Sequence, residues 1–238
     1  MELNEIAGFY DKFAEQQAKT GINLRIYGLY KRAIRWGLNK NSNVLELGCG
    51  IGTVTFMLSK TVINGKIESV DLSPKSIEFA QKKLQHSNIY LSVGDVVDYE
   101  PKLKNLDIIT LFDVIEHIPL ERHGDLFRNI SNYMESGSKL LINIPNPDYI
   151  EYLREHRPDK LQVIDQSIPL ETIVENVLNA GLDIQFFEKY SLWAENDYCF
   201  YVVTRKRRFE EELPKNRTIM NKIYNRMVSI KTKLFYKY

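Results

Sequence analysis

The stretch Val44-Leu45-Glu46-Leu47-Gly48-Cys49-Gly50-Ile51-Gly52-Thr53 decides the fold of this 238-residue chain. Its first four residues are mostly apolar or β-branched and predict a buried strand. Three glycines then alternate with other residues, and glycine permits a tight turn with a ligand close to the main chain. Residues 53–60 follow with a pattern typical of a helix start. A strand, a glycine turn and a helix in this order open a nucleotide-binding unit.

The glycine spacing indicates a ligand other than a dinucleotide. Dinucleotide sites space their glycines G-x-G-x-x-G, whereas this turn has G-x-G-x-G. Glu46 precedes the first glycine by two residues, and a carboxylate there suits a cationic ligand better than a pyrophosphate. In Glu46, Gly48, Gly50 and Gly52 the chain resembles the class I methyltransferases that use S-adenosylmethionine (SAM), whose first motif is E-x-G-x-G-x-G. A purely structural glycine turn is the alternative interpretation.

Length and composition indicate one globular α/β domain with appendages. The chain is 44% hydrophobic and 26% charged, as expected for a folded domain. We expect a cytoplasmic protein, because no apolar run approaches ~18 residues and the first residues are acidic, unlike a signal peptide. Peripheral contact at the inner face of the membrane is left open. Cys49 and Cys199 are expected to be reduced thiols.

Charge is unevenly distributed along the chain. Residues 205–238 contain eleven Lys or Arg and three Glu, a balance of +8, so the net +1 of the whole leaves −7 for residues 1–204. An acidic body argues against a nucleic-acid substrate, because such binding needs a basic face. The string Asn146-Pro147-Asp148-Tyr149 is similar to a motif of DNA adenine methyltransferases, but it follows the fifth strand here and not the fourth. We therefore expect no DNA partner.

Hydrophobic periodicity predicts alternating strands and helices. We expect helices at 3–19, 22–36, from 74, at 120–134 and at 169–180, and strands at 44–47, 66–71, 89–93, 106–112, 139–144, 184–187 and 199–204. This alternation predicts an α/β fold with a doubly wound, mostly parallel sheet. The resemblance implies seven strands, the last one antiparallel. We expect an N-terminal helical lid at 1–40, a Rossmann-like domain at 41–204, a tail at 205–238, and an irregular loop at 145–168.

Further motifs follow in the order that the resemblance implies. Asp71 ends the second strand, where a carboxylate can accept both ribose hydroxyl protons, and Asp95 follows the third, where it can accept from an adenine amine. A helix cap and an ordinary turn are their alternatives. Residues 112–119 contain D-x-x-E-H-I, similar to small-molecule methyltransferases, where this segment lines the methionine end of SAM and the acceptor. The resemblance covers residues 42–204. We expect SAM binding by Tyr10, Arg25, Glu46, Gly48, Cys49, Gly50, Gly52, Asp71, Leu72, Asp95, Val96, Phe112 and Asp113, and S-adenosylhomocysteine as product.

Two histidines are candidates for a general base. His117 lies in the D-x-x-E-H-I segment, and a histidine near its ordinary pKa of ~6.5 can take a proton at neutral pH. A structural hydrogen bond to the backbone is its alternative role. His123 is the rival base, and His156 in the long loop is a third candidate.

The acceptor is predicted from polar and aromatic residues late in the chain. Asn146, His156, Gln166, Tyr190 and Trp193 are expected to bind it, since polar loops with aromatic rings suit a sugar or a glycolipid-linked intermediate. Methyl transfer to O or N of a small molecule is the predicted function. The alternatives are a SAM-binding sensor or scaffold without turnover, and a protein or RNA methyltransferase. No zinc spacing is present and no metal is expected, with Asp113 and Asp165 left open as carboxylate ligands.

The tail, residues 213–238, is predicted to be a separate amphipathic helix. Ile219, Ile223, Met227, Ile230 and Leu234 recur at helical spacing among basic residues. A helix of this kind can dock on its own acidic body, on a second subunit or on an anionic membrane. The oligomeric state is not predicted.

Overall fold

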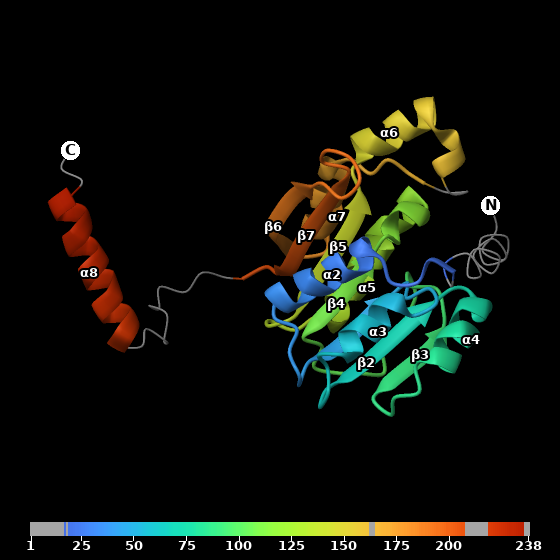
Figure 1. The fold of residues 1–238 in the computed structure, drawn as a ribbon, viewed down its shortest axis with the longest axis horizontal. Helices are drawn as coiled ribbons and strands as arrows, with labels where there is room; N and C mark the ends of the chain where they lie inside the picture. Colours follow the sequence, from blue (N-terminus) through green and yellow to red (C-terminus); the bar gives the residue numbers. More distant parts are fainter. Residues whose placement is uncertain (1–16, 18, 162–164, 208–218, 236–238) are drawn as a thin grey trace. The chain divides into compact units, whose positions relative to one another are not determined.

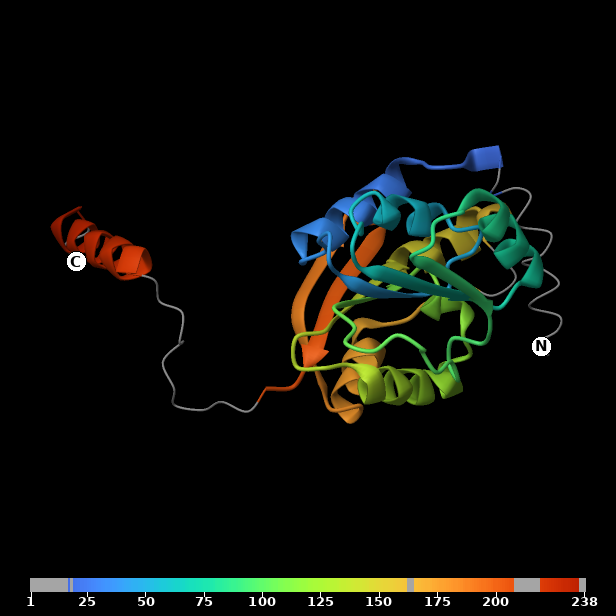
Figure 2. The same ribbon diagram turned by 90° about the horizontal axis from the view of Figure 1, so that it is seen from below.

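Seven strands form one sheet in the order β3-β2-β1-β4-β5-β7-β6. The computed structural model describes residues 17, 19–161, 165–207 and 219–235 (Figure 1). The chain divides into two compact units, Met1–Lys206 and Arg207–Tyr238. The sheet lies in the first unit, with helices on both of its faces (Figure 2). The predicted doubly wound sheet of seven strands is confirmed.

The elements have the following bounds. The strands are β1 (Asn43–Leu47), β2 (Lys66–Asp71), β3 (Ile89–Val93), β4 (Ile108–Phe112), β5 (Lys139–Pro145), β6 (Leu182–Tyr190) and β7 (Tyr198–Arg205). The α-helices are α2 (Leu24–Arg35), α3 (Thr53–Ser59), α4 (Pro74–Lys83), α5 (His123–Tyr133), α6 (Pro147–His156), α7 (Leu170–Asn179) and α8 (Ile219–Phe235). Short 3-10 turns are Ile115–His117, Leu120–Arg122 and Pro158–Lys160.

The strand pairing puts five carboxyl ends along one edge of the sheet. Strands β3, β2, β1, β4 and β5 pair in parallel, whereas β7 is antiparallel to both β5 and β6. The chain leaves β1 toward β2 and β3, then returns to place β4 on the other side of β1. Ligands of open α/β sheets bind at such a reversal of strand order. The fold therefore favours a site beyond the ends of β1 and β4.

The sheet separates two apolar cores. Leu45 and Leu47 face a core that includes Phe127 of α5 and Ile173 of α7. Val44 faces the opposite core, with residues of α2 and α3. Side chains of a strand alternate between its faces, so every second residue of β1 enters the same core. Both faces are covered by helices, which explains why β4 is apolar along most of its length.

The helix starts follow capping chemistry. Ser73 accepts a hydrogen bond from the amide of Ser76 at the start of α4, and Pro74 takes the first helical position. Proline suits this position because its missing N–H would have no intrahelical partner. Asn23 caps α2 in the same way by accepting from the amide of Ile26.

The prediction of an irregular loop over 145–168 is wrong. This segment contains α6, in which Asn146 accepts from the amide of Asp148 and Pro147 occupies the first helical position. The same Asn-Pro pair that suggested a rigid loop is a helix-start signal. The last two strands extend beyond the predicted ranges, and Arg205 belongs to β7. The predicted helix at 3–19 lies almost wholly outside the described residues.

Candidate functional site

A cavity of about 290 Å³ opens at the carboxyl edge of the sheet. Its walls come from the turn after β1, the ends of β2 and β4, the loop after β3, and α2 with the residues before it. The lining comprises Gln17, Thr20, Gly21, Asn23, Arg25, Ile26, Leu29, Gly48, Cys49, Gly50, Thr53, Val54, Asp71, Leu72, Ser76, Asp95, Val96, Phe112, Asp113, Val114, His117, Ile118, Pro119 and Arg122. The predicted glycine turn and D-x-x-E-H-I segment therefore meet in one cavity.

The glycine turn has no room for side chains. Gly48 has φ +78°, and a Cβ built on it would lie 2.2 Å from Cγ2 of Val114. The amides of Gly48 and Cys49 both donate to the carbonyl of Val70, at 2.8 and 3.0 Å. These contacts hold the turn against β2. The main chain of the turn consequently forms part of the cavity wall, as a close-approaching ligand requires.

Asp71 and Asp95 line the cavity from neighbouring strands. The carboxylate of Asp71 accepts from the amides of Gly50 at 2.7 Å and Ser73 at 2.9 Å, which fixes its orientation. Asp95 pairs with Arg122 at 2.7 Å, a contact the sequence analysis missed. Arg122 lies four residues after Ile118, the last residue of the D-x-x-E-H-I segment, and this nearness is the signal that could have indicated it.

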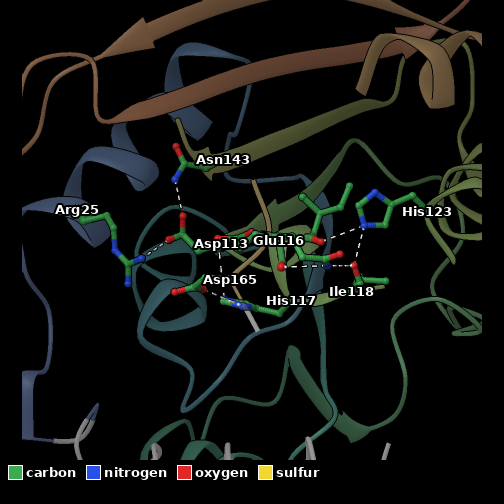
Figure 3. A network of polar contacts seen from close by, with 10 residues as sticks. Arg25, Asp113, Glu116, His117, Ile118, His123, Asn143 and Asp165 are labelled. Carbon is green, nitrogen blue, oxygen red and sulfur yellow. Dashed lines mark hydrogen bonds and ion pairs between the residues drawn. The ribbon is translucent and has the colours of Figure 1, made fainter. Parts of the chain in front are cut away.

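A chain of polar contacts leads from the cavity into the sheet (Figure 3). Arg25 forms an ion pair with Asp113, whose other oxygen accepts from Asn143 at 2.7 Å. Asn143 in turn accepts from the hydroxyl of Tyr190 at 2.8 Å. Asp113 has φ +56°, a strained conformation for a residue with a side chain. The Nε atom of Arg25 is buried and has no hydrogen-bond partner among the described residues.

A second group of ionisable residues lies beside Asp113. Nδ1 of His117 is 3.2 Å from Asp165, and its Nε2 is 4.0 Å from Glu116 (Figure 3). Asp165 comes from the chain between α6 and α7, far from His117 in sequence. Burial, together with the charge of Asp113, holds the pKa of Glu116 well above its usual range. Burial therefore favours the neutral form of Glu116, which lies next to a histidine that lines the cavity.

Two residues predicted to bind the cofactor lie behind the cavity wall. Glu46 is buried with 3% of its surface exposed and accepts from the hydroxyls of Thr55 and Ser69. It faces the core and does not meet a cation in the cavity. Gly52 also lies outside the lining, and a Cβ there would lie 2.7 Å from Cδ1 of Leu84, at the end of α4. Its role is packing of the helix that follows the turn.

His123 is fully buried and does not line the cavity. Its Nε2 is 3.1 Å from the carbonyl of Ile115 and 2.9 Å from that of Ile118, so this nitrogen donates to the backbone. Burial lowers its pKa from the ordinary value. A general base must reach the acceptor, and His123 is therefore withdrawn as a candidate.

The residues predicted to bind the acceptor lie elsewhere. Asn146 caps α6, Gln166 donates to the carbonyls of Glu116 and Ile118, and Tyr190 contacts Asn143. His156 is exposed and stacks on Tyr152, and Trp193 is 61% exposed. None of the five appears in the cavity lining. Gln166 and Tyr190 support the site through other residues. Tyr10, predicted to cover SAM, lies outside the described residues.

The chemistry of the lining fits an adenosyl cofactor with an amino-acid tail. Asp71 offers a fixed carboxylate for paired hydroxyls, and the glycine turn presents bare main chain. Arg25 carries the unpartnered buried Nε described above, a donor suited to a carboxylate. Val96, Leu72 and Phe112 supply apolar surface for a ring or an aliphatic chain. These groups match the predicted SAM-binding set, with Glu46 and Gly52 in supporting positions.

Comparison with known proteins agrees with this geometry. A family model described as a methyltransferase domain matches residues 44–137. The chain is 32% identical over 148 residues to malonyl-[acyl-carrier protein] O-methyltransferase 1 of Ilyobacter polytropus, which covers 61% of this chain and 51% of that protein. It is 28% identical over 116 residues to trans-aconitate 2-methyltransferase of Mycobacterium tuberculosis, which covers 49% and 42%. The chain thus spans about half the length of these relatives.

The fold is also found in solved structures. Magnesium protoporphyrin IX methyltransferase from Synechocystis, crystallised with S-adenosylhomocysteine, superposes with a TM-score of 0.67 at 13% identity. The match covers 86% of this chain and 99% of that one. At this identity the likeness concerns the fold. The chain thus matches the methyltransferase-domain family over residues 44–137 and shares the class I, Rossmann-like fold of SAM-dependent methyltransferases over most of its length.

Proposed function

We propose that this chain transfers a methyl group from SAM to an oxygen or nitrogen atom of a small molecule. The observation that carries the proposal is one cavity in which Asp71 and the glycine turn lie with Arg25, Asp113 and His117. The first set suits the nucleoside of the cofactor, and the second supplies charge and a proton acceptor beside it. Methyl transfer needs donor and acceptor to be held together and aligned, which a single enclosed site provides.

Different residues would bind different parts of the cofactor. Asp71 would accept from the ribose hydroxyls, and Arg25 would meet the carboxylate of the methionine part while Asp113 holds its guanidinium in place. When bound, SAM supplies a methyl group activated by a sulfonium. Val114 packs tightly against the turn at Gly48, and the two would form one wall of the site around the bound cofactor.

His117 would take the proton of a hydroxyl acceptor. Asp165 accepts from Nδ1, and this contact favours the tautomer in which Nε2 carries the lone pair. The acceptor O–H bond would break as its proton passes to Nε2, and the oxygen electron pair would form the new bond to the methyl carbon. The carbon–sulfur bond would break at the same time, and its electron pair would leave with sulfur in S-adenosylhomocysteine. Asp165 acts as a positioning residue that stabilises the imidazolium. The burial that raises the pKa of Glu116 disfavours a second carboxylate charge beside His117.

The acceptor class is supported mainly by the relatives. Malonyl-[acyl-carrier protein] O-methyltransferase is named for methyl transfer to oxygen, and this relative favours an oxygen over a nitrogen acceptor atom here. A sugar or glycolipid-linked acceptor is the finer proposal. The loop residues that suggested it, including Trp193 and His156, do not line the cavity, so its support is the polar lining around His117 and Arg122.

Two other functions share the same cofactor site. A SAM sensor or scaffold would bind the cofactor without turnover, and a protein or RNA methyltransferase would place its acceptor on a macromolecule. The −7 balance of residues 1–204 disfavours RNA, whereas the +8 tail favours an anionic partner.

Methyl transfer from labelled SAM into a host extract tests the proposal. The extract is separated into lipid, small soluble, protein and nucleic-acid fractions, and SAM binding is measured in parallel by calorimetry. We expect label in the small soluble or lipid fraction, lost in Asp71→Ala together with SAM binding. Label only in protein or nucleic acid would overturn the substrate class. Bound SAM without label in any fraction would favour the sensor.

A further inference from the structure

Helix α8 carries an exposed apolar stripe. Ile223, Met227, Ile230 and Leu234 follow one another at spacings of four, three and four residues, which places them on one face of the helix. Their exposed fractions are 52, 65, 52 and 65%. The helix belongs to the separate unit Arg207–Tyr238. A continuous apolar stripe on a surface marks a site of interaction.

The charge around the stripe has a single sign. Residues 213–238 contain seven Lys or Arg and no Asp or Glu. Arg226 and Lys231 lie about 70° to either side of the stripe at 100° per residue, and both are exposed. Asn225 and Ser229 lie on the opposite face. Long basic side chains at the border of an apolar face can keep their charge in water while their stems cover apolar surface.

This arrangement selects the kind of partner. If a second copy of the helix packed on the stripe, the Arg226 and Lys231 side chains of the two copies would lie close together. Like charges beside a helix–helix interface repel each other. An anionic lipid surface satisfies both features at once, since acyl chains accept the stripe and phosphates accept the basic border. Exposed aromatic side chains at Tyr224 and Phe235 suit the headgroup level.

We propose that α8 lies in the plane of an anionic bilayer surface with its Ile223–Leu234 stripe in the acyl boundary. Among the described residues no helix is long and apolar enough to cross a bilayer, so the contact is peripheral. Binding uses two contributions, apolar burial and charge, and each is modest alone. The interaction is therefore reversible and sensitive to salt.

Vesicle co-sedimentation of the full chain tests this proposal. Vesicles of phosphatidylcholine alone are compared with vesicles containing phosphatidylglycerol, at low and high salt. We expect binding to the anionic vesicles only, weakened by salt. The double variant Met227→Asp, Ile230→Asp should bind at least about tenfold more weakly, because it places charge in the acyl boundary.

A charge-matched control separates the stripe from simple electrostatics. Asn225→Asp, Ser229→Asp adds the same two charges on the opposite face and should weaken binding only a few-fold. Equal losses in the two variants would overturn the in-plane placement. Failure of the wild-type chain to bind anionic vesicles, as docking on its own body or on a second copy would give, would overturn the proposal. Thermal unfolding of the full-length variants verifies that the substitutions leave the first unit, Met1–Lys206, folded.

Discussion

Gly48 combines a left-handed backbone with a neighbour that leaves no space for a side chain. Its φ is +78°, and a built Cβ meets Val114 at 2.2 Å, so alanine must displace both the turn and the β4 loop. We expect Gly48→Ala to weaken SAM binding at least about tenfold and to cost roughly 1–3 kcal/mol of unfolding free energy. Calorimetric titration with SAM and urea unfolding measure the two effects.

Gly137 provides the matched control for this substitution. A Cβ built there has no neighbour within 4 Å, and its φ lies outside the left-handed region. Gly137→Ala should therefore bind SAM as the wild type does. If Gly48→Ala also kept wild-type affinity, the turn would not form the cofactor wall.

The buried carboxyl of Glu46 should make the stability of the fold depend on pH. Burial raises its pKa from 4.5 to about 7, partly offset by the hydroxyls of Thr55 and Ser69. Between these two pH values the folded state holds a proton that the unfolded state has lost, so stability falls as pH rises through that window. The loss is on the order of 3 kcal/mol when complete. Between pH 5 and pH 8, the unfolding free energy of the wild type should therefore fall further than that of Glu46→Gln.

Urea unfolding of both proteins across this pH range measures the difference. Glu46→Gln keeps an oxygen that can accept from Thr55 and Ser69 but does not titrate. A gap between the two unfolding free energies that stays constant with pH would show that Glu46 does not change its protonation there.

At the residue scale, the sequence predicts which residues belong to the site better than it predicts where their side chains point. The glycine turn, Asp71 and the D-x-x-E-H-I segment all reach the cavity as expected. Glu46 was assigned to the ligand although strand alternation places it on the same face as buried Val44. The partner of His117, Asp165, lies 48 residues away in sequence, and only the packed fold brings them together.

At the scale of elements, we expect the two histidines after β4 to have different roles, structural for His123 and catalytic for His117. His123 donates to the carbonyls of Ile115 and Ile118 and so fixes the turn that carries His117. We expect His123→Ala to cost about 1–3 kcal/mol of unfolding free energy through the lost bonds. His117→Ala should keep the stability and SAM affinity and lower the methyl-transfer rate by about 10²–10⁴. Thermal unfolding and single-turnover transfer separate the two variants.

The opposite pattern would refute this division of roles. Wild-type transfer in His117→Ala would rule out base catalysis by this residue. A second variant tests the positioning role of Asp165. Asp165→Asn should shift the pH profile of methyl transfer to lower pH, because the imidazolium of His117 loses its stabilising charge. A purely structural role for Asp165 would leave that profile in place.

Element boundaries could be predicted where one signal dominates. Strands β2 and β3 have the predicted bounds, because their apolar runs are bordered by polar or turn residues. Helix α6 was missed because Pro147 was taken as a loop residue, although a capping Asn before Pro also begins a helix. The five residues predicted to bind the acceptor do not line the cavity, because composition cannot show which way polar and aromatic side chains face.

At the scale of the whole molecule, the chain combines an acidic cofactor-binding unit with a basic helix. The balances of −7 for residues 1–204 and +8 for the remainder are a property of the sequence. The charge separation and the helix could therefore be predicted, whereas the choice between membrane and protein contact depends on the position of each charge around the stripe. A lipid-linked acceptor would give both units a common location, and the vesicle and transfer experiments test these two ideas independently.

The division into two units predicts that the first one folds alone, provided the cut respects β7. Arg205 donates to the carbonyls of Met134 at 2.7 Å and Ser131 at 2.6 Å, so truncation after Thr204 would remove a bond between β7 and the end of α5. Truncation after Lys206 keeps these bonds and removes Arg207–Tyr238. We expect the shortened chain to keep its unfolding temperature within a few degrees and its SAM affinity within about twofold, since no cavity residue is lost. It should no longer bind anionic vesicles. Aggregation or loss of SAM binding in the shortened chain would instead mean that the basic helix completes the fold of the first unit.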